Sequence, residues 1–268
     1  MTTRLILFAM LLLTAAKNAP PENWRQQWKV PVKGTKLYAD NLGNPFVVNA
    51  DELIKFRDDG SVFRLYSNKS LGAITSVDVS NPLKILLFYK DFSRIVFLDN
   101  TLSANGNPIY LDEYGLEQAS QVCTSYDNGF WVFEPVHYRL IRFNQHLQET
   151  ARVLNLNQLT GSALRPAFML EHENKLYMSD PERGILQFDI FGTYIKTIPL
   201  KGIKKFRVAG DAIFYTNGHG ALNSFGLKTL TESQRDLPFK DYADWEFGKD
   251  RLLLLSADSL FLYRIPQR

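Results

Sequence analysis

The side chains that could do chemistry recur in short polar turns, each of which follows an apolar run. Acidic side chains stand in three of these turns, as Asp91, Glu134 and Asp180. Carboxylates that converged on one point could hold a calcium ion, which prefers several oxygen ligands. The corresponding positions of the next two turns are Asn217 and Ala257, so the acidic pattern covers only part of the chain. We therefore expect no metal ion and no cofactor, and a calcium site in the centre of the fold is the alternative.

The same turns carry aromatic, basic and imidazole side chains, which suit recognition of a partner. Loops on a rigid framework are a common place for such residues. The other interpretation is that these are ordinary polar hairpin turns. The candidate partner-binding residues are Asp91, Phe92, Glu134, His137, Tyr138, Asp180, Glu182, Arg183 and His219.

Local motifs of catalysis are missing from the sequence. None of His137, His146, His172 and His219 lies two or four residues from another, so no local zinc pair exists. The chain also lacks a G-x-S-x-G elbow, a P-loop and a dinucleotide fingerprint. The single cysteine, Cys123, lies in an alternating run and is expected to be a small strand residue.

Charge gives little indication of a partner. The chain has 31 basic and 28 acidic residues, a formal net charge of +3, which argues against nucleic acid as the partner. The basic run Lys201, Lys204, Lys205 and Arg207 alternates along an expected strand and is interpreted as a solvated face. Residues 171–173, Glu-His-Glu, are interpreted as a polar turn between strands.

The polar turns are held by pairs of strands that repeat along the chain. An apolar strand residue and the aromatic or apolar residue that closes the next strand are twelve positions apart in four units, from Leu86, Trp131, Leu176 and Ile213. Two outer units have spacings of ten and eleven. The six pairs are PFVVNA with LIKF, KILLFYK with RIVFL, GFWVFEP with RLIRF, KLYMSDP with GILQF, AIFYTNG with ALNSF, and RLLLLSA with LFLY.

A further short strand precedes each pair, and a fourth follows most of them. Four strands in about 42 residues is typical of one blade of a β-propeller. The sequence therefore predicts an all-β, six-bladed β-propeller of four-stranded antiparallel blades, with almost no helix. The last unit ends one strand short, and the strand around Trp28 has no hairpin partner of its own. We expect this N-terminal strand to join the C-terminal blade and close the ring.

One unit, residues 175–200, carries a family resemblance. Its apolar strand ends in Asp, a basic residue follows in the turn, and the next strand ends in an aromatic residue, Asp and Gly. These features make it similar to NHL repeats and to related six-bladed propellers. The resemblance implies the fold, and it implies as an alternative function a calcium-dependent lactonase or esterase, or a sugar dehydrogenase, with a site at the central channel. The matching residues are Tyr177, Asp180, Arg183, Phe188, Asp189 and Gly192.

The N-terminus indicates export. Residues 1–16 have the pattern of a secretory signal peptide, since Arg4 precedes an apolar run of nine residues and then small residues at 14–16. The run is shorter than the roughly 20 residues that span a bilayer, so cleavage is favoured over an uncleaved anchor carrying a sensor-like domain. Residues 17–268 would then form one propeller domain, secreted and most simply periplasmic, because one cysteine allows no internal disulfide.

The function expected from the sequence is that of a scaffold. We expect a monomeric, non-catalytic propeller that binds an unknown protein or glycan of the cell envelope through its rim loops and has no stable membrane span after cleavage. A rigid ring would lose little ordering entropy on binding.

Cleavage of the leader gives a direct test. We expect the mature protein to begin at Lys17, because the small residues at 14–16 fit the cleavage site. N-terminal sequencing of protein recovered from the native host checks this. Recovery of Met1 or Thr2 in a membrane fraction would contradict it.

Overall fold

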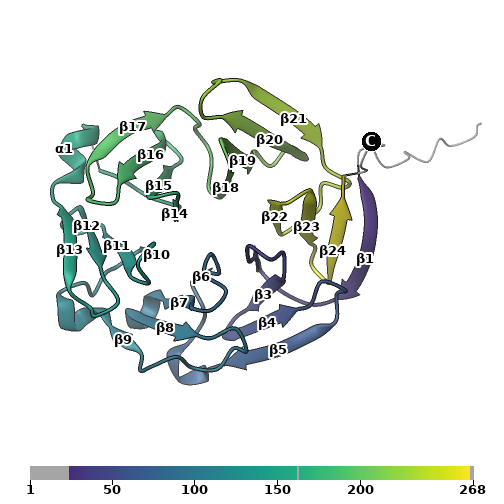
Figure 1. The fold of residues 1–268 in the computed structure, drawn as a ribbon, viewed down its shortest axis with the longest axis horizontal. Helices are drawn as coiled ribbons and strands as arrows, with labels where there is room; N and C mark the ends of the chain where they lie inside the picture. The colour runs from purple at the N-terminus through teal and green to yellow at the C-terminus, as the bar shows by residue number, and fades with distance from the viewer. Residues whose placement is uncertain (1–23, 162, 266–268) are drawn as a thin grey trace, which may run out of the picture.

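The chain folds into a ring of six four-stranded antiparallel sheets around a central channel (Figure 1). This computed structural model describes residues 24–161 and 163–265. Each sheet is a blade, and the prediction of a six-bladed β-propeller is confirmed. The expected leader, residues 1–16, lies outside the described residues.

Three blades follow one another from the N-terminal side, with the first strand of each at the channel (Figure 1). Blade 1 consists of β2 (Lys36–Ala39), β3 (Pro45–Asn49), β4 (Glu52–Phe56) and β5 (Val62–Ser67). Blade 2 consists of β6 (Ser76–Asp78), β7 (Ile85–Tyr89), β8 (Arg94–Leu98) and β9 (Ile109–Tyr110). Blade 3 consists of β10 (Gln121–Thr124), β11 (Phe130–Glu134), β12 (Arg139–Phe143) and β13 (Glu149–Val153).

The remaining blades complete the circle, and the last takes a strand from each end of the chain. Blade 4 consists of β14 (Phe168–His172), β15 (Lys175–Asp180), β16 (Gly184–Asp189) and β17 (Tyr194–Ile198). Blade 5 consists of β18 (Phe206–Ala209), β19 (Ala212–Thr216), β20 (Ala221–Gly226) and β21 (Glu232–Asp236). Blade 6 consists of β22 (Asp244–Gly248), β23 (Arg251–Leu255), β24 (Ser259–Arg264) and β1 (Arg25–Pro31).

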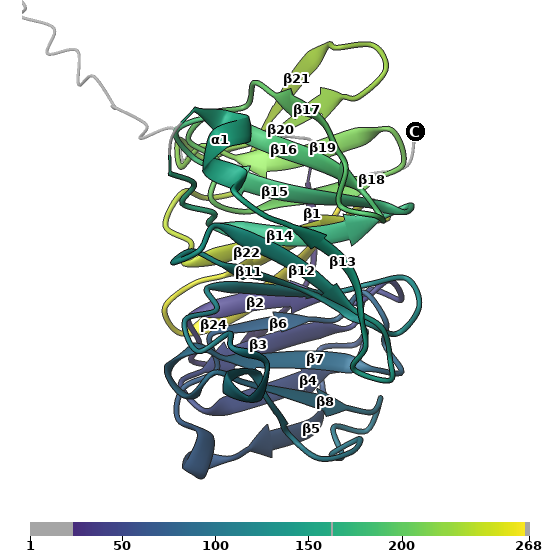
Figure 2. The same ribbon diagram turned by 90° about the vertical axis from the view of Figure 1, so that its left-hand side faces the viewer.

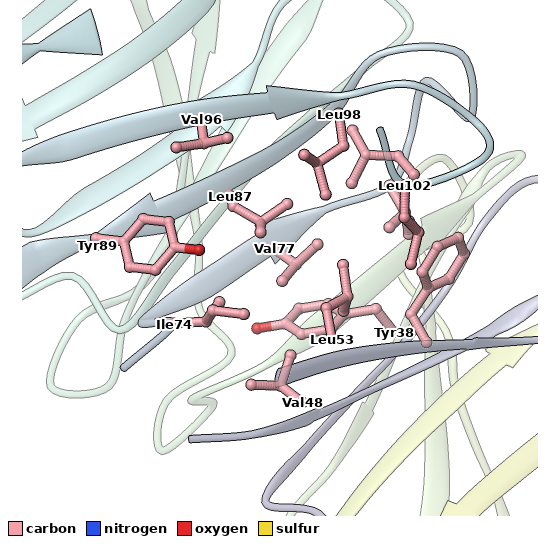
Figure 3. Close-up of a cluster of buried hydrophobic side chains, with 13 residues drawn as sticks. Tyr38, Val48, Leu53, Ile74, Val77, Leu87, Tyr89, Val96, Leu98 and Leu102 are labelled. Atoms are coloured by element: carbon pink, nitrogen blue, oxygen red, sulfur yellow. The ribbon is translucent and has the colours of Figure 1, made fainter. Parts of the chain in front are cut away.

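The middle strands are mostly apolar because a neighbouring blade covers each of their faces. Every residue of β7 is buried, whereas the outermost strand β21, with the sequence ESQRD, is mostly exposed. Between blades 1 and 2, Tyr38, Val48 and Leu53 pack against Val77 and Leu87 (Figure 3). Burying each such side chain contributes about 1.5–3 kcal/mol. A blade is therefore stable only when the adjacent blades cover its apolar faces.

Closure of the ring follows the expectation from the sequence. β1 pairs antiparallel with β24, with Trp28 opposite Leu262. The indole Nε1 of Trp28 also donates to the carbonyl oxygen of Asp58, 2.8 Å away in the β4–β5 turn of blade 1. The first strand thus ties blade 6 both to the end of the chain and to blade 1.

Helix is almost absent from the described residues, as expected. One short helix, α1 (Leu156–Thr160), lies in the link from blade 3 to blade 4 and was not predicted from the sequence. Three short 3-10 turns, η1 (Lys69–Leu71), η2 (Lys90–Phe92) and η3 (Leu111–Tyr114), also occur. Cys123 is fully buried in β10, and burial raises the pKa of its thiol well above the usual value. It is a packing residue, as predicted.

Substitution of Trp28 tests the closure. We expect Trp28→Ala to lower the free energy of unfolding by about 2 kcal/mol, because a half-buried indole and its hydrogen bond are lost. Urea unfolding of the purified protein measures this. Gln27→Ala, at an exposed position of the same strand, is the matched control and should change stability by less than about 0.5 kcal/mol. Equal stability of the two variants would contradict closure through β1.

Candidate binding site at the channel mouth

The ring has two faces, and both are built from turns (Figure 2). The link face carries the turns between the second and third strands of each blade, together with the links between blades. The opposite face, called the cavity face here, carries the turns between the first and second strands and those between the third and fourth strands. The nine residues predicted from the sequence all lie in or directly beside turns of the link face.

The predicted residues differ in their exposure. Asp91, His137, Glu182 and His219 are exposed, and Phe92 is 50% exposed. A role for these side chains in binding stays a prediction. Tyr138 and Arg183 are half-buried in the same turns.

Glu134 and Asp180 are buried, with 2% and 0% of each residue exposed. The Glu134 carboxylate accepts from the backbone N–H of Val136 at 2.6 Å and that of His137 at 3.1 Å, and it pairs with Arg139. Burial alone would raise the pKa of Glu134, but the hydrogen bonds from His137, Val136 and Arg139 bring it below its usual value. This carboxylate is committed to its own turn.

Asp180 plays the same part in the next blade. It accepts from the backbone N–H of Glu182 at 3.0 Å and that of Arg165 at 2.9 Å, and it pairs with Arg183. The structure therefore gives Glu134 and Asp180 separate partners in separate turns and does not bring them to a common point. In residues 24–161 and 163–265, no group of three or more His, Cys, Asp or Glu side chains is placed to hold a metal ion.

A cavity of about 650 Å³ occupies the channel and is lined by residues of the cavity face. Its wall consists of the inner strands β6, β10, β14, β18 and β22, the end of β2, and the turns that follow them. None of the nine predicted residues lines it. Side chains in the wall include Tyr38, Asp78, Thr124, Phe168, Arg207 and Glu246.

An ion-pair network at the channel joins three blades. The Lys205 ammonium of blade 5 lies 2.9 Å from Asp244 and 2.9 Å from Glu246, both on β22 of blade 6. It also donates to the carbonyl oxygen of Leu37 in blade 1, at 2.6 Å. Arg207 pairs with Glu246 and donates to the carbonyl oxygen of Ala39 at 3.3 Å. The interpretation of Lys205 and Arg207 as a solvated face was therefore wrong.

The network affects ionisation in its neighbourhood. Burial lowers the pKa of Arg207, but the Glu246 carboxylate more than offsets this, so the pKa lies above its ordinary value. Burial, and then the Asp244 carboxylate, raise the pKa of Tyr38, which stays neutral. The sequence signal for this network is a shared spacing. Lys205, directly before β18, is two residues from Arg207 in β18, and Asp244 is two residues from Glu246 in β22.

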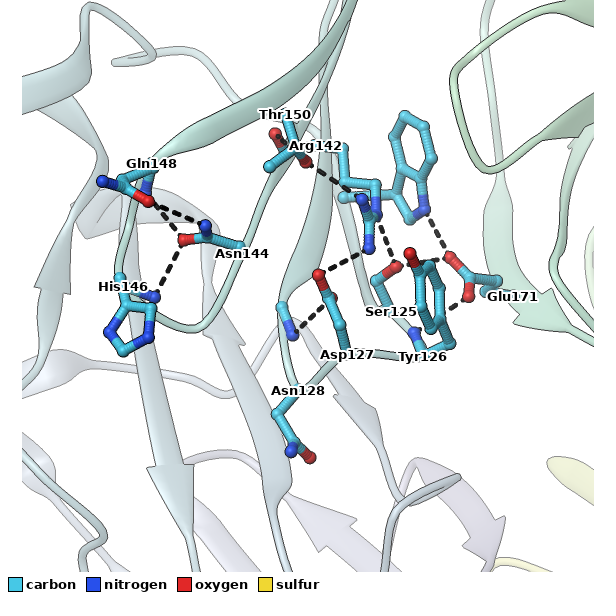
Figure 4. Close-up of polar contacts among 12 residues, drawn as sticks. Ser125, Tyr126, Asp127, Asn128, Arg142, Asn144, His146, Gln148, Thr150 and Glu171 are labelled. Carbon is cyan, nitrogen blue, oxygen red and sulfur yellow. Dashed lines mark hydrogen bonds and ion pairs between the residues drawn. The ribbon is translucent and has the colours of Figure 1, made fainter.

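Further carboxylates hold the inner strand of blade 3. Asp78 accepts from the backbone N–H of Thr124 at 2.8 Å. Glu171 accepts from the backbone N–H of Tyr126 at 2.9 Å, and from Ser125 and Trp131 at 2.6 Å each (Figure 4). The prediction that residues 171–173 form a polar turn was wrong for Glu171 and His172, which belong to β14.

Three large apolar or aromatic side chains stand on successive turns beside the cavity. Leu42, Leu83 and Tyr126 are 63%, 66% and 57% exposed. A side-chain oxygen fixes the backbone N–H of each, from Asp40 at 3.0 Å, Asn81 at 3.0 Å and Glu171 at 2.9 Å respectively. These three residues are called the turn tips below. They are apolar groups presented to solvent by a fixed backbone.

No protein-family model and no curated protein sequence matches the chain. Solved structures match it in fold. The WD40 domain of Pan2 from Neurospora crassa is 8% identical, with a TM-score of 0.65, and the match covers 92% of this chain and 97% of that domain. A streptogramin B lyase is 11% identical, with a TM-score of 0.62 and coverage of 93% and 90%. BBS1N, solved in complex with ARL6DN, is 13% identical, with a TM-score of 0.54 and coverage of 84% and 75%.

The likeness to these structures shows the fold and nothing finer, because propellers host unrelated tasks. The class of protein is a β-propeller with four-stranded blades. Within the described residues, 24–161 and 163–265, no helix is long and apolar enough to cross a bilayer.

Substitution of Lys205 tests the channel network. We expect Lys205→Met to lower the free energy of unfolding by about 3 kcal/mol, because Asp244 and Glu246 lose a shared cation away from bulk water. Chemical denaturation measures the loss. Lys204→Met, at an exposed neighbouring position, removes the same charge and should have almost no effect. If both variants unfold at the same denaturant concentration, the network does not hold the three blades together.

Proposed function

We propose that the chain is a non-catalytic binding propeller whose cavity face holds a segment of a partner protein. The observation that carries the proposal is the set of turn tips, Leu42, Leu83 and Tyr126, each more than half exposed beside a cavity of about 650 Å³. Concave sites with apolar surroundings are where proteins usually hold ligands. Exposed apolar groups that gather on one face are typical of protein interfaces.

The chemistry of the channel wall supports binding over catalysis. Lys205, Arg207, Asp244 and Glu246 are engaged with one another and with backbone carbonyl groups. Asp78 and Glu171 hold backbone N–H groups of the neighbouring blade. Groups committed in this way stabilise the ring, so the free energy of binding would come from the apolar turn tips.

Among the turn tips, Tyr126 is suited to act as an anchor because its side chain is already held in place. The Tyr126 ring lies against the Arg142 guanidinium, whose carbon is 4.6 Å from the ring centroid. Arg142 is itself held by Asp127 at 2.8 Å and by Ser125 at 2.8 Å (Figure 4). Side chains that are fixed before binding lose less entropy in the complex.

The proposal also covers the cellular location of the protein and its family. The leader pattern supports an exported protein that is periplasmic or envelope-associated, and the motif from Tyr177 to Gly192 supports a relation to NHL-like propellers. The partner would be a protein or glycoprotein of the envelope. The link face, with Phe92, His137 and Arg183, is the other surface available to it.

Matched substitutions on the two faces test the proposal. We expect the triple variant Leu42→Ser, Leu83→Ser and Tyr126→Ser to capture at least about tenfold less partner from native envelope extracts, since interface anchors carry most of the binding energy. Affinity capture followed by quantitative mass spectrometry measures the loss against the unaltered protein.

The control removes three apolar groups from the opposite face that are also at least half exposed. Phe92, Val136 and Leu154 are 50%, 51% and 53% exposed on the link face, and their triple serine variant should retain capture. If only this control variant loses capture, the partner binds the link face and the proposed cavity-face interface is wrong. If neither triple variant changes the captured proteins, the chain is not a protein-binding scaffold of this kind.

A further inference from the structure

A second, smaller hollow lies on the cavity face, away from the channel and between blades 2 and 3. Its volume is about 220 Å³. It is called the amide groove here, because five of its ten lining residues carry side-chain amides. The other lining residues are four apolar side chains and one lysine. The amides belong to Asn105, Asn107, Asn128, Asn144 and Gln145, and the remaining residues are Lys84, Phe97, Ile109, Phe130 and Leu147.

The two phenylalanine side chains form the deep part of the groove. Phe97 and Phe130 are 7% and 2% exposed, whereas Asn105, Asn107 and Asn128 are exposed at its edge. The order from the bottom outward is therefore aromatic rings first and amides last. A ligand that fills the groove needs one apolar side and a polar perimeter.

The amides are not equally available. Asn144 is used by its own turn, since it accepts from the backbone N–H of His146 at 2.9 Å and that of Gln148 at 3.0 Å (Figure 4). Asn128 accepts from Asn81 at 3.0 Å through its side-chain oxygen, which leaves its NH₂ group as a donor. The side-chain amides of Asn105 and Asn107 make no hydrogen bond to other described residues. Both are free to bond a ligand as donor and acceptor.

The groove holds one charged side chain, that of Lys84, and its ammonium already has partners. No carboxylate lines it. The Lys84 ammonium donates to the carbonyl oxygen of Asn128 at 2.6 Å and lies 4.3 Å from the centroid of the Phe97 ring. Burial lowers the pKa of Lys84, which reflects the cost of keeping this cation away from water. A cation would find no counter-charge in the groove, and an anion would have to share the Lys84 ammonium with the partners that it already has. A neutral ligand therefore suits the groove better.

We propose that the amide groove binds one ring of a neutral carbohydrate. A sugar ring has apolar C–H groups on one side and hydroxyl groups around its edge, which matches the apolar floor and the amide perimeter. Each hydroxyl is both donor and acceptor, and a side-chain amide offers both functions in one plane. The groove is smaller than the roughly 300–1,000 Å³ of sites for drug-sized ligands, so it takes a single ring of a longer glycan. This proposal does not depend on the protein partner proposed above.

NMR titration of the full chain tests the proposal with two defined probes, N,N′-diacetylchitobiose and maltose. We expect at least one of them to shift the side-chain NH₂ resonances of Asn105, Asn107 and Asn128 in a saturable way. The Kd should be on the order of millimolar, because sugar hydroxyl groups exchange bonds to water for bonds to amides with little net gain. The double variant Asn105→Ala and Asn107→Ala should weaken binding at least about tenfold.

Controls separate sugar binding from its alternatives. Asn41→Ala removes an exposed amide in a turn at the channel cavity and should leave the titration unchanged. The uncharged peptide acetyl-Ala-Ala-Ala-amide should produce no shift, and saturable shifts from it alone would make the groove a peptide site and overturn the proposal. Absence of shifts with both sugars at about 50 mM, or binding that the double variant does not weaken, would also overturn it.

Discussion

The constraint on which this ring depends is the inner edge of its blades. The first strand of each blade pairs with the rest of its sheet on one side only, so its other side turns unpaired backbone N–H and C=O groups toward the channel. A buried backbone group without a partner costs about 1–3 kcal/mol. Side chains of other blades provide partners. Asp244 accepts from the N–H of Leu37 at 2.7 Å, Asp78 from that of Thr124, and Lys205 donates to the carbonyl oxygen of Leu37.

These side-chain contacts concentrate where the ring must be closed. Blade 6 is completed at its outer edge by β1, which the N-terminal part of the chain supplies. At its inner edge, Lys205 links Asp244 and Glu246 to blade 1. The seam between the two ends of the chain is thus held on both sides by non-covalent contacts. The one cysteine is buried and free, so packing and these contacts take the place of disulfides.

Much of the architecture could be predicted from the sequence, because a blade leaves a local signal. Alternation in β1 and unbroken apolar runs such as β7 are properties of a few adjacent residues. The channel network could not be predicted in this way. Whether Lys205 faces water or the channel depends on Asp244, which is distant in sequence and close only after the ring closes. The burial of Glu134 and Asp180 could not be predicted for a related reason, because an acid at the end of a buried strand can turn inward and accept the N–H groups of its own turn.

The same constraint accounts for the kind of groups that remain for recognition. Carboxylates and cations at the inner edge are needed to satisfy the backbone, and using them for a ligand would leave strand edges unpaired. The turns of the cavity face lie beyond those edges, and their side chains are not needed to bond the backbone of the inner strands. The tips of these turns can therefore be apolar or amide side chains such as Leu83 and Asn107. Contacts made by uncharged groups depend little on ionic strength. Under the proposed functions, the ring would therefore use charge to hold itself together and uncharged surface to bind.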